Sequence, residues 1–548
     1  MMKKLKKILA VLLAVLIAFS CVSATAFAAE KIDPNDGAGG KLKTYLYRAL
    51  DKIVSFVVSI LNRVIPGIEK NWPSVGDFKP SGDFYPGKEK FDTEKDDGAK
   101  WSAGYSSVSL IKDLEYKDGV YRYKGKKLYM AGTLEPLKGR QPTEIVDDQQ
   151  VCTYALSDGK GGIVVHAVLD GYGIASGDVL KIRNRLASFA KEKNIVSINV
   201  SVLHQHSCVD ILGMAAPLLP ALLTNPFLTV IGGDLNDYTG GKTPEFMENV
   251  YETVAMTVTE AVNDMEEGTL YYGSADVSEY IRDKRDPQVF DSEVHRFRFD
   301  PDNESANEIW ICETGMHATG VGLSGTKISA DYPYYFRQSV KETTGADAVL
   351  VQGAELAITV NYDNVGYEGD NDFEKVAVMG AALADKVASI DNDTALEPVL
   401  NIAFENVLIE ESNEILELAV REGLVSSVLA KTKPGEYDVV TELGYMELGN
   451  KVGVVIVPGE IAPEILWGGV IESGKTWKGE SWSYPSFAET AKVQKLLCFG
   501  LANDQIGYII PDNDFRSMFT ENEEINASSN KAASTLTEAF GALIERVK

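Results

Sequence analysis

The stretch Ile195–Cys208 reads IVSINVSVLHQHSC, and the expected fold is organised around it. From 196 to 202 Val and Ile alternate with Ser and Asn, which predicts a β-strand with one buried face. The strand would carry His204 and His206 at its end, and side chains at i and i+2 of an extended chain point to the same side. The chain has only five His residues. Two within three residues indicate either a metal site, since His is the commonest metal ligand, or an ordinary pair of solvated or carbonyl-bonded His.

Further apolar strands alternate with helical segments along the chain. Strands are predicted at 163–169, 308–312, 347–351 and 452–457, and helices at 179–193, 244–265, 334–343, 373–390, 487–497 and 531–547. The alternation predicts an α/β fold, with one large catalytic domain over residues 101–548. His166 lies within one of the predicted strands, where we expect a hydrogen-bonded core His. The sequence contains no internal repeat, GxGxxG motif or P-loop.

The first hundred residues have a different composition. Residues 1–28 combine Lys3, Lys4, Lys6 and Lys7 with an apolar run and an Ala-Phe-Ala end, so they are predicted to be a cleaved secretory signal peptide. Residues 29–100 are expected to hold an amphipathic helix at 42–65 and a Pro-rich linker. The helix either covers part of the globular body or makes a peripheral membrane contact. We expect a secreted protein, with membrane association through 42–65 as the open alternative.

Charge and cysteine content limit the classes of function. The formal net charge is −27, and such an acidic surface repels phosphate backbones, which argues against a nucleic-acid partner. The cysteines beyond the signal peptide are Cys152, Cys208, Cys312 and Cys498. An even number in an exported chain allows two disulfides, but scattered cysteines in a large chain can equally be buried thiols.

Three more candidate residues follow predicted strands or short turn motifs. His317 lies in GMHATG, Glu460 lies in VPGE, and Tyr508 ends the segment GLANDQIGY. Each motif is ordinary alone, so the order of the set along the chain is the informative observation. Two His and one carboxylate form a known catalytic zinc set that leaves room for water or substrate.

In this order of motifs the chain resembles the neutral or alkaline non-lysosomal ceramidases, over roughly residues 102–511. That family has a strand ending in HTH, a later His followed by an SSD-like motif, a PGE motif and a GLSN-type segment ending in Tyr. This chain has HQH at 204–206, His317 followed by ISAD at 328–331, VPGE, and GLAN ending in Tyr508. The resemblance implies zinc as the cofactor, with His204, His317, Glu460 and Tyr508 as ligands and His206 as a catalytic residue.

The resemblance also implies hydrolysis of the amide bond of a lipid-like substrate, by water that zinc activates. The chain departs from the family where a catalytic Ser stands in GDVSPN, because the matching ELAITVN at 355–361 places Thr359 there. The immunoglobulin-like domain that follows the catalytic domain in the family is not expected here. Two alternatives stay open: a hydrolase of another acyl or ester substrate, or a non-catalytic binding protein on the same scaffold.

Overall fold

The computed structural model describes the chain except for residues 1–44, 54–71, 76–83, 134–138, 216–241, 434–435, 477–478 and 518–523. The expected signal peptide and most of the expected helix at 42–65 lie outside the described residues. Residues 45–53 are helical, with Leu46 61% and Ile53 56% exposed. Within the described residues, no helix combines the length and the apolar character that crossing a bilayer requires.

The larger of two main sheets has nine strands and is mixed. Its order is β14 (Asp347–Gln352), β12 (Ile309–Thr314), β11 (Glu293–Pro301), β9 (Glu266–Asp276), β1 (Trp101–Ser109), β6 (Gln150–Ser157), β7 (Ile163–Leu169) and β8 (Ile195–Val202), with β16 (Thr394–Ala395) paired to β9. The pairs β12–β14 and β7–β8 are parallel, and the other neighbours are antiparallel. The carboxyl ends of β8 and β12 lead to His204 and His317.

The smaller main sheet has five strands. Its order is β17 (Leu400–Glu410), β19 (Glu436–Leu448), β20 (Val452–Ile456) and β22 (Lys495–Phe499), with β18 (Val428–Lys433) paired to β19. Only β20 and β22 run parallel to each other. Shorter groups are β2–β3–β4 (Leu114–Lys117, Val120–Tyr123, Lys126–Lys127), β5–β13 (Glu144–Ile145, Lys327–Ile328), β10–β15 (Ile281–Asp283, Ile358–Val360) and β21–β23 (Glu460–Ile461, Tyr508–Ile509).

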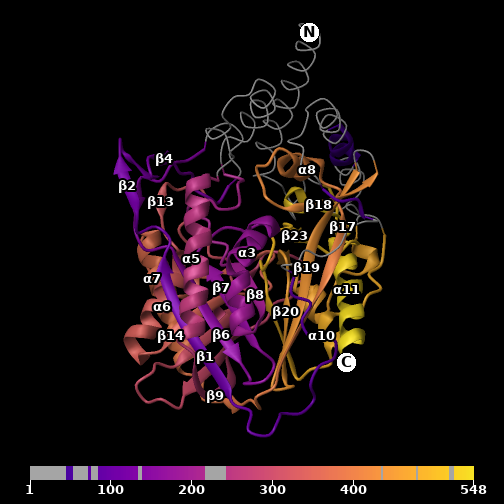
Figure 1. The fold of residues 1–548 in the computed structure, drawn as a ribbon. Coiled ribbons are helices and arrows are strands. Elements are labelled where there is room, and N and C mark those ends of the chain that lie inside the picture. Colours follow the sequence, from indigo (N-terminus) through magenta and orange to yellow (C-terminus); the bar gives the residue numbers. More distant parts are fainter. Residues whose placement is uncertain are drawn as a thin grey trace.

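The two main sheets pack between helices, which gives four layers (Figure 1). Buried apolar side chains such as Tyr154, Val454 and Phe499 belong to the core between the sheets. Helices α3 (Ser176–Lys193), α5 (Pro244–Asn263), α6 (Asp331–Thr344) and α7 (Asp372–Ala388) pack on the larger sheet. Helices α8 (Glu414–Arg421), α9 (Pro463–Trp467), α10 (Phe487–Ala491) and α11 (Ala532–Val547) join the core of the smaller sheet, where Phe540 is fully buried. Apolar stripes on the helices and apolar faces on the strands therefore cover one another.

The observed elements confirm the α/β class, and one predicted helix is partly wrong. The expected helix at 487–497 ends at Ala491, because Lys492 takes a left-handed conformation with φ 54° and caps it. Lys495–Phe499 then forms β22, which pairs in parallel with β20. Pairing with a buried strand outweighs the weak helical preference of this short apolar run.

The described end of the expected linker follows the smaller sheet. The Lys88 amide donates to the Ile402 carbonyl at 2.8 Å, and the Phe404 amide donates to the Pro86 carbonyl at 3.0 Å. Residues 86–88 therefore pair with β17 along the edge of the sheet. The four cysteines outside the expected signal peptide are buried free thiols, which decides between the two alternatives left open for them.

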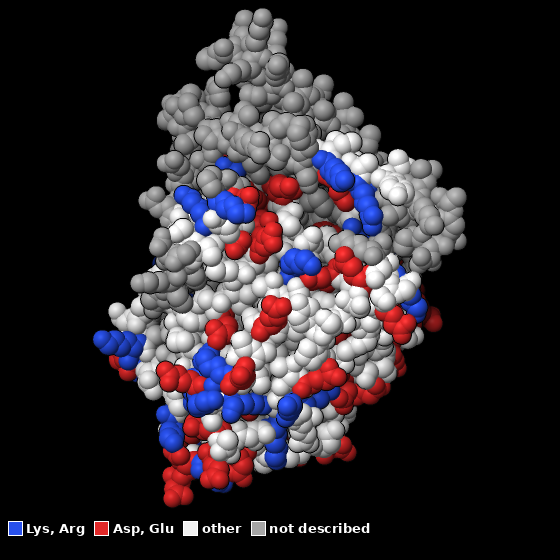
Figure 2. Space-filling view, turned by 90° about the vertical axis from the view of Figure 1, so that its right-hand side faces the viewer, with Lys and Arg blue, Asp and Glu red and all other residues white. Residues whose placement is uncertain are grey.

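On the face drawn in Figure 2, Asp and Glu side chains lie interspersed with Lys and Arg side chains. The described part of this face therefore carries charges of both signs.

Candidate metal centre

The candidate site lies where strands of the two main sheets end side by side. β8 leads to His204, β12 to His317, β14 to Glu355 and β20 to Glu460. The strand ends are tied together by backbone hydrogen bonds, from the Gly500 amide after β22 to the Gln352 carbonyl of β14 at 2.8 Å and from the Asn503 amide to the Val200 carbonyl of β8 at 2.7 Å. Buried strands thus deliver polar side chains to one edge, which is where α/β folds commonly place their sites.

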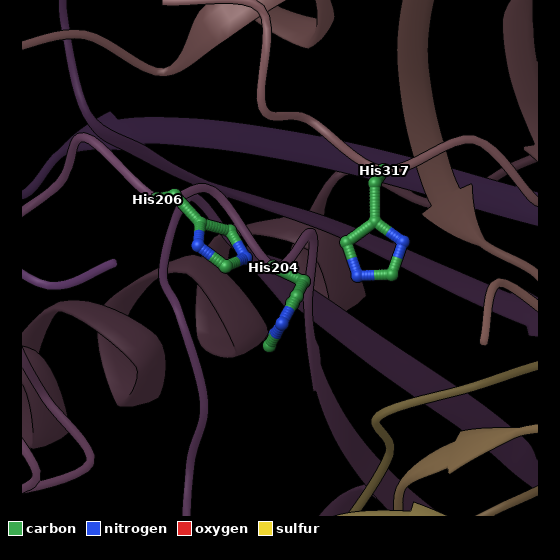
Figure 3. A group of neighbouring side chains, drawn as sticks. All are labelled: His204, His206 and His317. Atoms are coloured by element: carbon green, nitrogen blue, oxygen red, sulfur yellow. The ribbon is translucent and has the colours of Figure 1, made fainter. Parts of the chain in front are cut away.

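Three of the five His residues converge there. The ring centroid of His204 lies 4.7 Å from that of His206 and 5.1 Å from that of His317. Figure 3 shows the His204 ring between the other two in that view. All three side chains are buried. Three buried imidazoles in contact favour a shared function over three independent packing roles.

Each of these imidazoles is held through its Nδ1 atom. His204 Nδ1 donates to the Tyr172 carbonyl at 2.6 Å, His206 Nδ1 to the Gly132 carbonyl at 2.9 Å, and His317 Nδ1 to the Ile358 carbonyl at 3.0 Å. A carbonyl oxygen only accepts, so each Nδ1 carries a proton, and Nε2 is the ring nitrogen that a ligand can use. Such backbone contacts fix the tautomer and the ring orientation of metal-binding His.

The chain at His204 is turned rather than extended, which corrects the expected geometry. β8 ends at Val202, and His204 has φ 54°, a left-handed conformation that is rare for a residue with a side chain. The predicted meeting of His204 and His206 is observed, but the proposed cause, alternation along an extended strand, is wrong. Strained backbone of this kind is concentrated at functional sites.

A buried hydrogen-bond network holds this turn. Gln205 donates from its backbone amide to the Gly171 carbonyl at 3.1 Å and from Nε2 to Asp170 Oδ1 at 2.8 Å. Arg337 of α6 donates to the same carboxylate from both terminal nitrogens, at 3.1 and 2.5 Å. The residue between the two His is therefore anchored to the end of β7 and to α6.

Glu460 joins two of the imidazoles. Its Oε1 lies 3.3 Å from His204 Nε2, and its Oε2 lies 3.2 Å from His317 Nε2. Two ligand atoms of a tetrahedral site with zinc-like bond lengths lie about 3.4 Å apart, and each of these two separations is close to that value. His206 Nε2 is buried and has no hydrogen-bond partner among the described residues. The chemistry of the donors and this orphaned nitrogen fit a divalent metal ion with a reacting group beside it.

The backbones of Tyr508 and Thr359 lie beside residues of this group. β23 begins at Tyr508 and pairs with β21 in the register Glu460 opposite Tyr508. The His317 amide donates to the Ile358 carbonyl at 3.2 Å, next to Thr359. The half-buried Thr359 directs its hydroxyl to the Arg282 carbonyl at 3.4 Å. The structure therefore brings the candidate ligand atoms of His204, His317 and Glu460 together, with His206 alongside.

Glu355 is the residue of this group that the sequence interpretation did not include. It is fully buried, its Oε2 lies 3.6 Å from His317 Nδ1, and the Gln352 side-chain amide donates to that oxygen. His204, His317, Glu355 and Glu460 each offer a ligand atom, and these atoms all lie within 4.8 Å of one another. Like Glu460, Glu355 follows an apolar strand by a few residues, which is the pattern that could have revealed it.

Burial and neighbouring charges set the protonation of the group. Burial lowers the pKa of His206 to about 3 and that of His204 well below its usual value, and the neighbouring His lower both further. Burial opposes protonation of His317 too, but Glu355 and Glu460 outweigh it and raise its pKa to about 9. Burial is also the main reason that the pKa of Glu355 is raised. A metal ion would have to displace protons here, so its binding should release them.

A second group of possible metal ligands is already paired with a Lys side chain. Asp291, Glu293 and His295 on or beside β11 also lie within ligand distance of one another. Lys495 Nζ lies 3.1 Å from Asp291 Oδ2 and 2.9 Å from Glu293 Oε2. This ammonium group bridges the two carboxylates and offsets part of their charge, so the cluster is explained without a metal.

Comparisons with known proteins support the architecture. No protein-family model matches the chain, and no curated protein matches it by sequence. Among solved structures, the chain is similar to neutral ceramidase from Pseudomonas aeruginosa, with a TM-score of 0.60, 14% identity, and coverage of 82% of this chain and 75% of that one. It is also similar to a ceramidase complexed with C2, with a TM-score of 0.59, 13% identity, and coverage of 82% and 76%. The chain therefore has a ceramidase-like α/β fold.

Proposed function

We propose that this protein is a zinc-dependent hydrolase that cleaves the amide bond of an N-acyl sphingoid or related lipid. The observation that carries the proposal is the Glu460 carboxylate between His204 Nε2 and His317 Nε2, at 3.3 and 3.2 Å. The orphaned His206 Nε2 beside them and the ceramidase-like fold add to it. His204, His317 and Glu460 would hold the ion, together with Tyr508, whose strand lies beside that of Glu460.

Bound zinc lowers the pKa of a coordinated water to about 7 and polarises a substrate carbonyl. In this scheme His206 transfers a proton from the attacking water to the leaving amine. Its Nε2 has no hydrogen-bond partner among the described residues, so it is free to accept a proton from the attacking water. The imidazolium formed then donates that proton to the leaving amine nitrogen. The Nδ1 contact to the Gly132 carbonyl keeps the ring oriented during both transfers.

Thr359 is proposed as a hydroxyl donor to the substrate carbonyl. Its backbone lies beside that of His317, through the bridge that joins them. To act, its hydroxyl would leave the Arg282 carbonyl, a long contact of 3.4 Å, and rotate toward the substrate. A donor of this kind stabilises the charge that develops on the carbonyl oxygen.

Product analysis tests the function. The zinc-loaded protein is incubated separately with a ceramide in mixed micelles, with a soluble N-acyl amino acid and with a fatty-acyl ester, and products are identified by mass spectrometry. We expect fatty acid and sphingoid base from the ceramide, and loss of this activity after chelation and in Glu460→Gln. Cleavage of only the other substrates would assign a different acyl specificity, and binding without cleavage would assign a binding protein.

We further propose that the protein is secreted and meets its substrate at a membrane surface through the segment 42–65, which the sequence predicts to be an amphipathic helix. Leu46 and Ile53, which are 61% and 56% exposed in its described part, support this contact. Co-sedimentation with zwitterionic liposomes tests it, with Leu46→Glu/Ile53→Glu as the comparison. We expect the double variant to stay in the supernatant, and equal sedimentation of both proteins would contradict the contact.

A further inference from the structure

We propose that Glu355 is a further direct ligand of the same metal ion, so that the site binds through two imidazoles and two carboxylates. This inference rests on the metal dependence of the proposed function, not on its substrate. It adds a ligand to the set that the ceramidase resemblance implies and does not depend on whether Tyr508 also coordinates.

Burial of an incompletely bonded carboxylate is the first argument. Glu355 is 0% exposed, and its Oε1 has no hydrogen-bond partner among the described residues. A buried polar atom without a partner destabilises a fold by roughly 1–3 kcal/mol, and more when it is charged. A metal ion bound next to Oε1 would supply the partner that this oxygen lacks and would offset the cost of its burial.

The position of Glu355 relative to the other donors is the second argument. Its ligand atom and those of His204, His317 and Glu460 lie within 4.8 Å of one another, so the four side chains are close enough to share one ion. Glu355 is not needed to orient His317. The Nδ1 of His317 already donates to the Ile358 carbonyl at 3.0 Å, whereas Glu355 Oε2 is 3.6 Å away.

The local backbone holds Glu355 against Glu460. The Ile358 amide donates to the Glu355 carbonyl at 2.7 Å and closes a turn in which Ala357 has φ 66°. The Leu356 amide reaches the Ile461 carbonyl, next to Glu460, at 3.4 Å. The Gln352 side-chain amide donates to Glu355 Oε2. The two carboxylates therefore approach the imidazoles from adjacent segments.

Zinc affinity and the cobalt(II) absorption spectrum test the role of Glu355 without any measurement of activity. The variant is Glu355→Gln, which keeps the shape and removes the charge. Its matched control is Glu313→Gln, also a buried carboxyl, on the neighbouring strand β12 and 3.9 Å from His295. Zinc dissociation constants come from competition with a chelator, and d–d bands of the cobalt-loaded protein report the ligand set.

We expect Glu355→Gln to bind zinc at least ~100-fold more weakly than the wild type, beyond the 10–100-fold typical of outer partners, and to shift the cobalt bands. Glu313→Gln should match the wild type in both. Glu355→Asp, which keeps the charge on a shorter side chain, should fall between them in affinity with a shifted spectrum. It provides the test if the Gln variant does not fold.

A cobalt spectrum unchanged in Glu355→Gln overturns the inference, whatever the affinity, because it places Glu355 outside the ligand set. A wild-type protein that binds no zinc or cobalt overturns both the inference and the metal-dependent function. Altered spectra together with no hydrolysis of any acyl substrate leave Glu355 as a ligand and remove only the proposed function.

Discussion

Removing Arg337 should show how strongly the turn at His204–His206 depends on one buried ion pair. Arg337 is 5% exposed and Asp170 is 1% exposed, and they are joined by two hydrogen bonds of 3.1 and 2.5 Å. Arg337→Leu keeps the volume of an apolar side chain but leaves the Asp170 carboxylate buried without its counter-ion. Breaking a buried pair in this way typically costs about 3–5 kcal/mol.

The pKa of Asp170 indicates how this carboxyl responds to the loss of Arg337. Burial raises this pKa, while Arg337 is the main group that lowers it. Without Arg337 the carboxyl would take up a proton more readily, which limits the loss. The double variant Arg337→Leu/Asp170→Asn has no buried charge, so it should lose less stability than the two single variants together, with a coupling of about 0.5–3 kcal/mol.

Urea denaturation of the metal-free protein measures the free energy of unfolding of all three variants. Arg185→Leu is the matched control, because Arg185 is 35% exposed and pairs with Glu248 at the surface, where ion pairs contribute about 0–1 kcal/mol. Zinc affinity is measured in parallel, since Gln205 donates to Asp170 and lies between two of the site His. A loss in Arg337→Leu no larger than that in Arg185→Leu would refute the proposed role of the pair.

Three other outcomes are expected. His206→Gln should lower turnover by roughly 10²–10⁴-fold with zinc still bound, as for a lost general acid–base group, and near-normal turnover would exclude His206 from proton transfer. Thr359→Val should lower turnover by roughly 10²-fold if the hydroxyl stabilises developing charge, while unchanged turnover with zinc bound would make it a structural residue. Burial lowers the pKa of His166 to about 3, so the folded state resists a proton that the unfolded chain accepts near pH 6.5. The free energy of unfolding should therefore fall as pH drops below 6.5, by up to about 1.4 kcal/mol per pH unit from this group, and His166→Gln should flatten that slope between pH 6 and 4. Equal slopes in wild type and variant urea titrations would contradict this.

Local patterns predicted the elements that are buried on both faces or that have a regular apolar stripe. The strands at 163–169 and 347–351 and the helix at 244–265 were placed within two residues of their observed bounds. The antiparallel strands β1, β6, β9 and β11 were not predicted, although they form the middle of the larger sheet. Their side chains include many Ser, Tyr, Glu and Arg residues, and the sheet partners that stabilise them lie far away in sequence.

For the candidate site, the sequence by itself determined the residue types and their order at strand ends, which is enough to propose His204, His317 and Glu460 as partners. Only the tertiary structure decided that Glu355 joins them, that Lys495 pairs with the other acidic group, and that His204 reaches the site through a left-handed turn. The physical reason is that apolar periodicity reflects the contact of one face with a core, and this contact is local to each element. Distances between donors depend on how two sheets stack and where loops close, and those are set by packing between segments hundreds of residues apart.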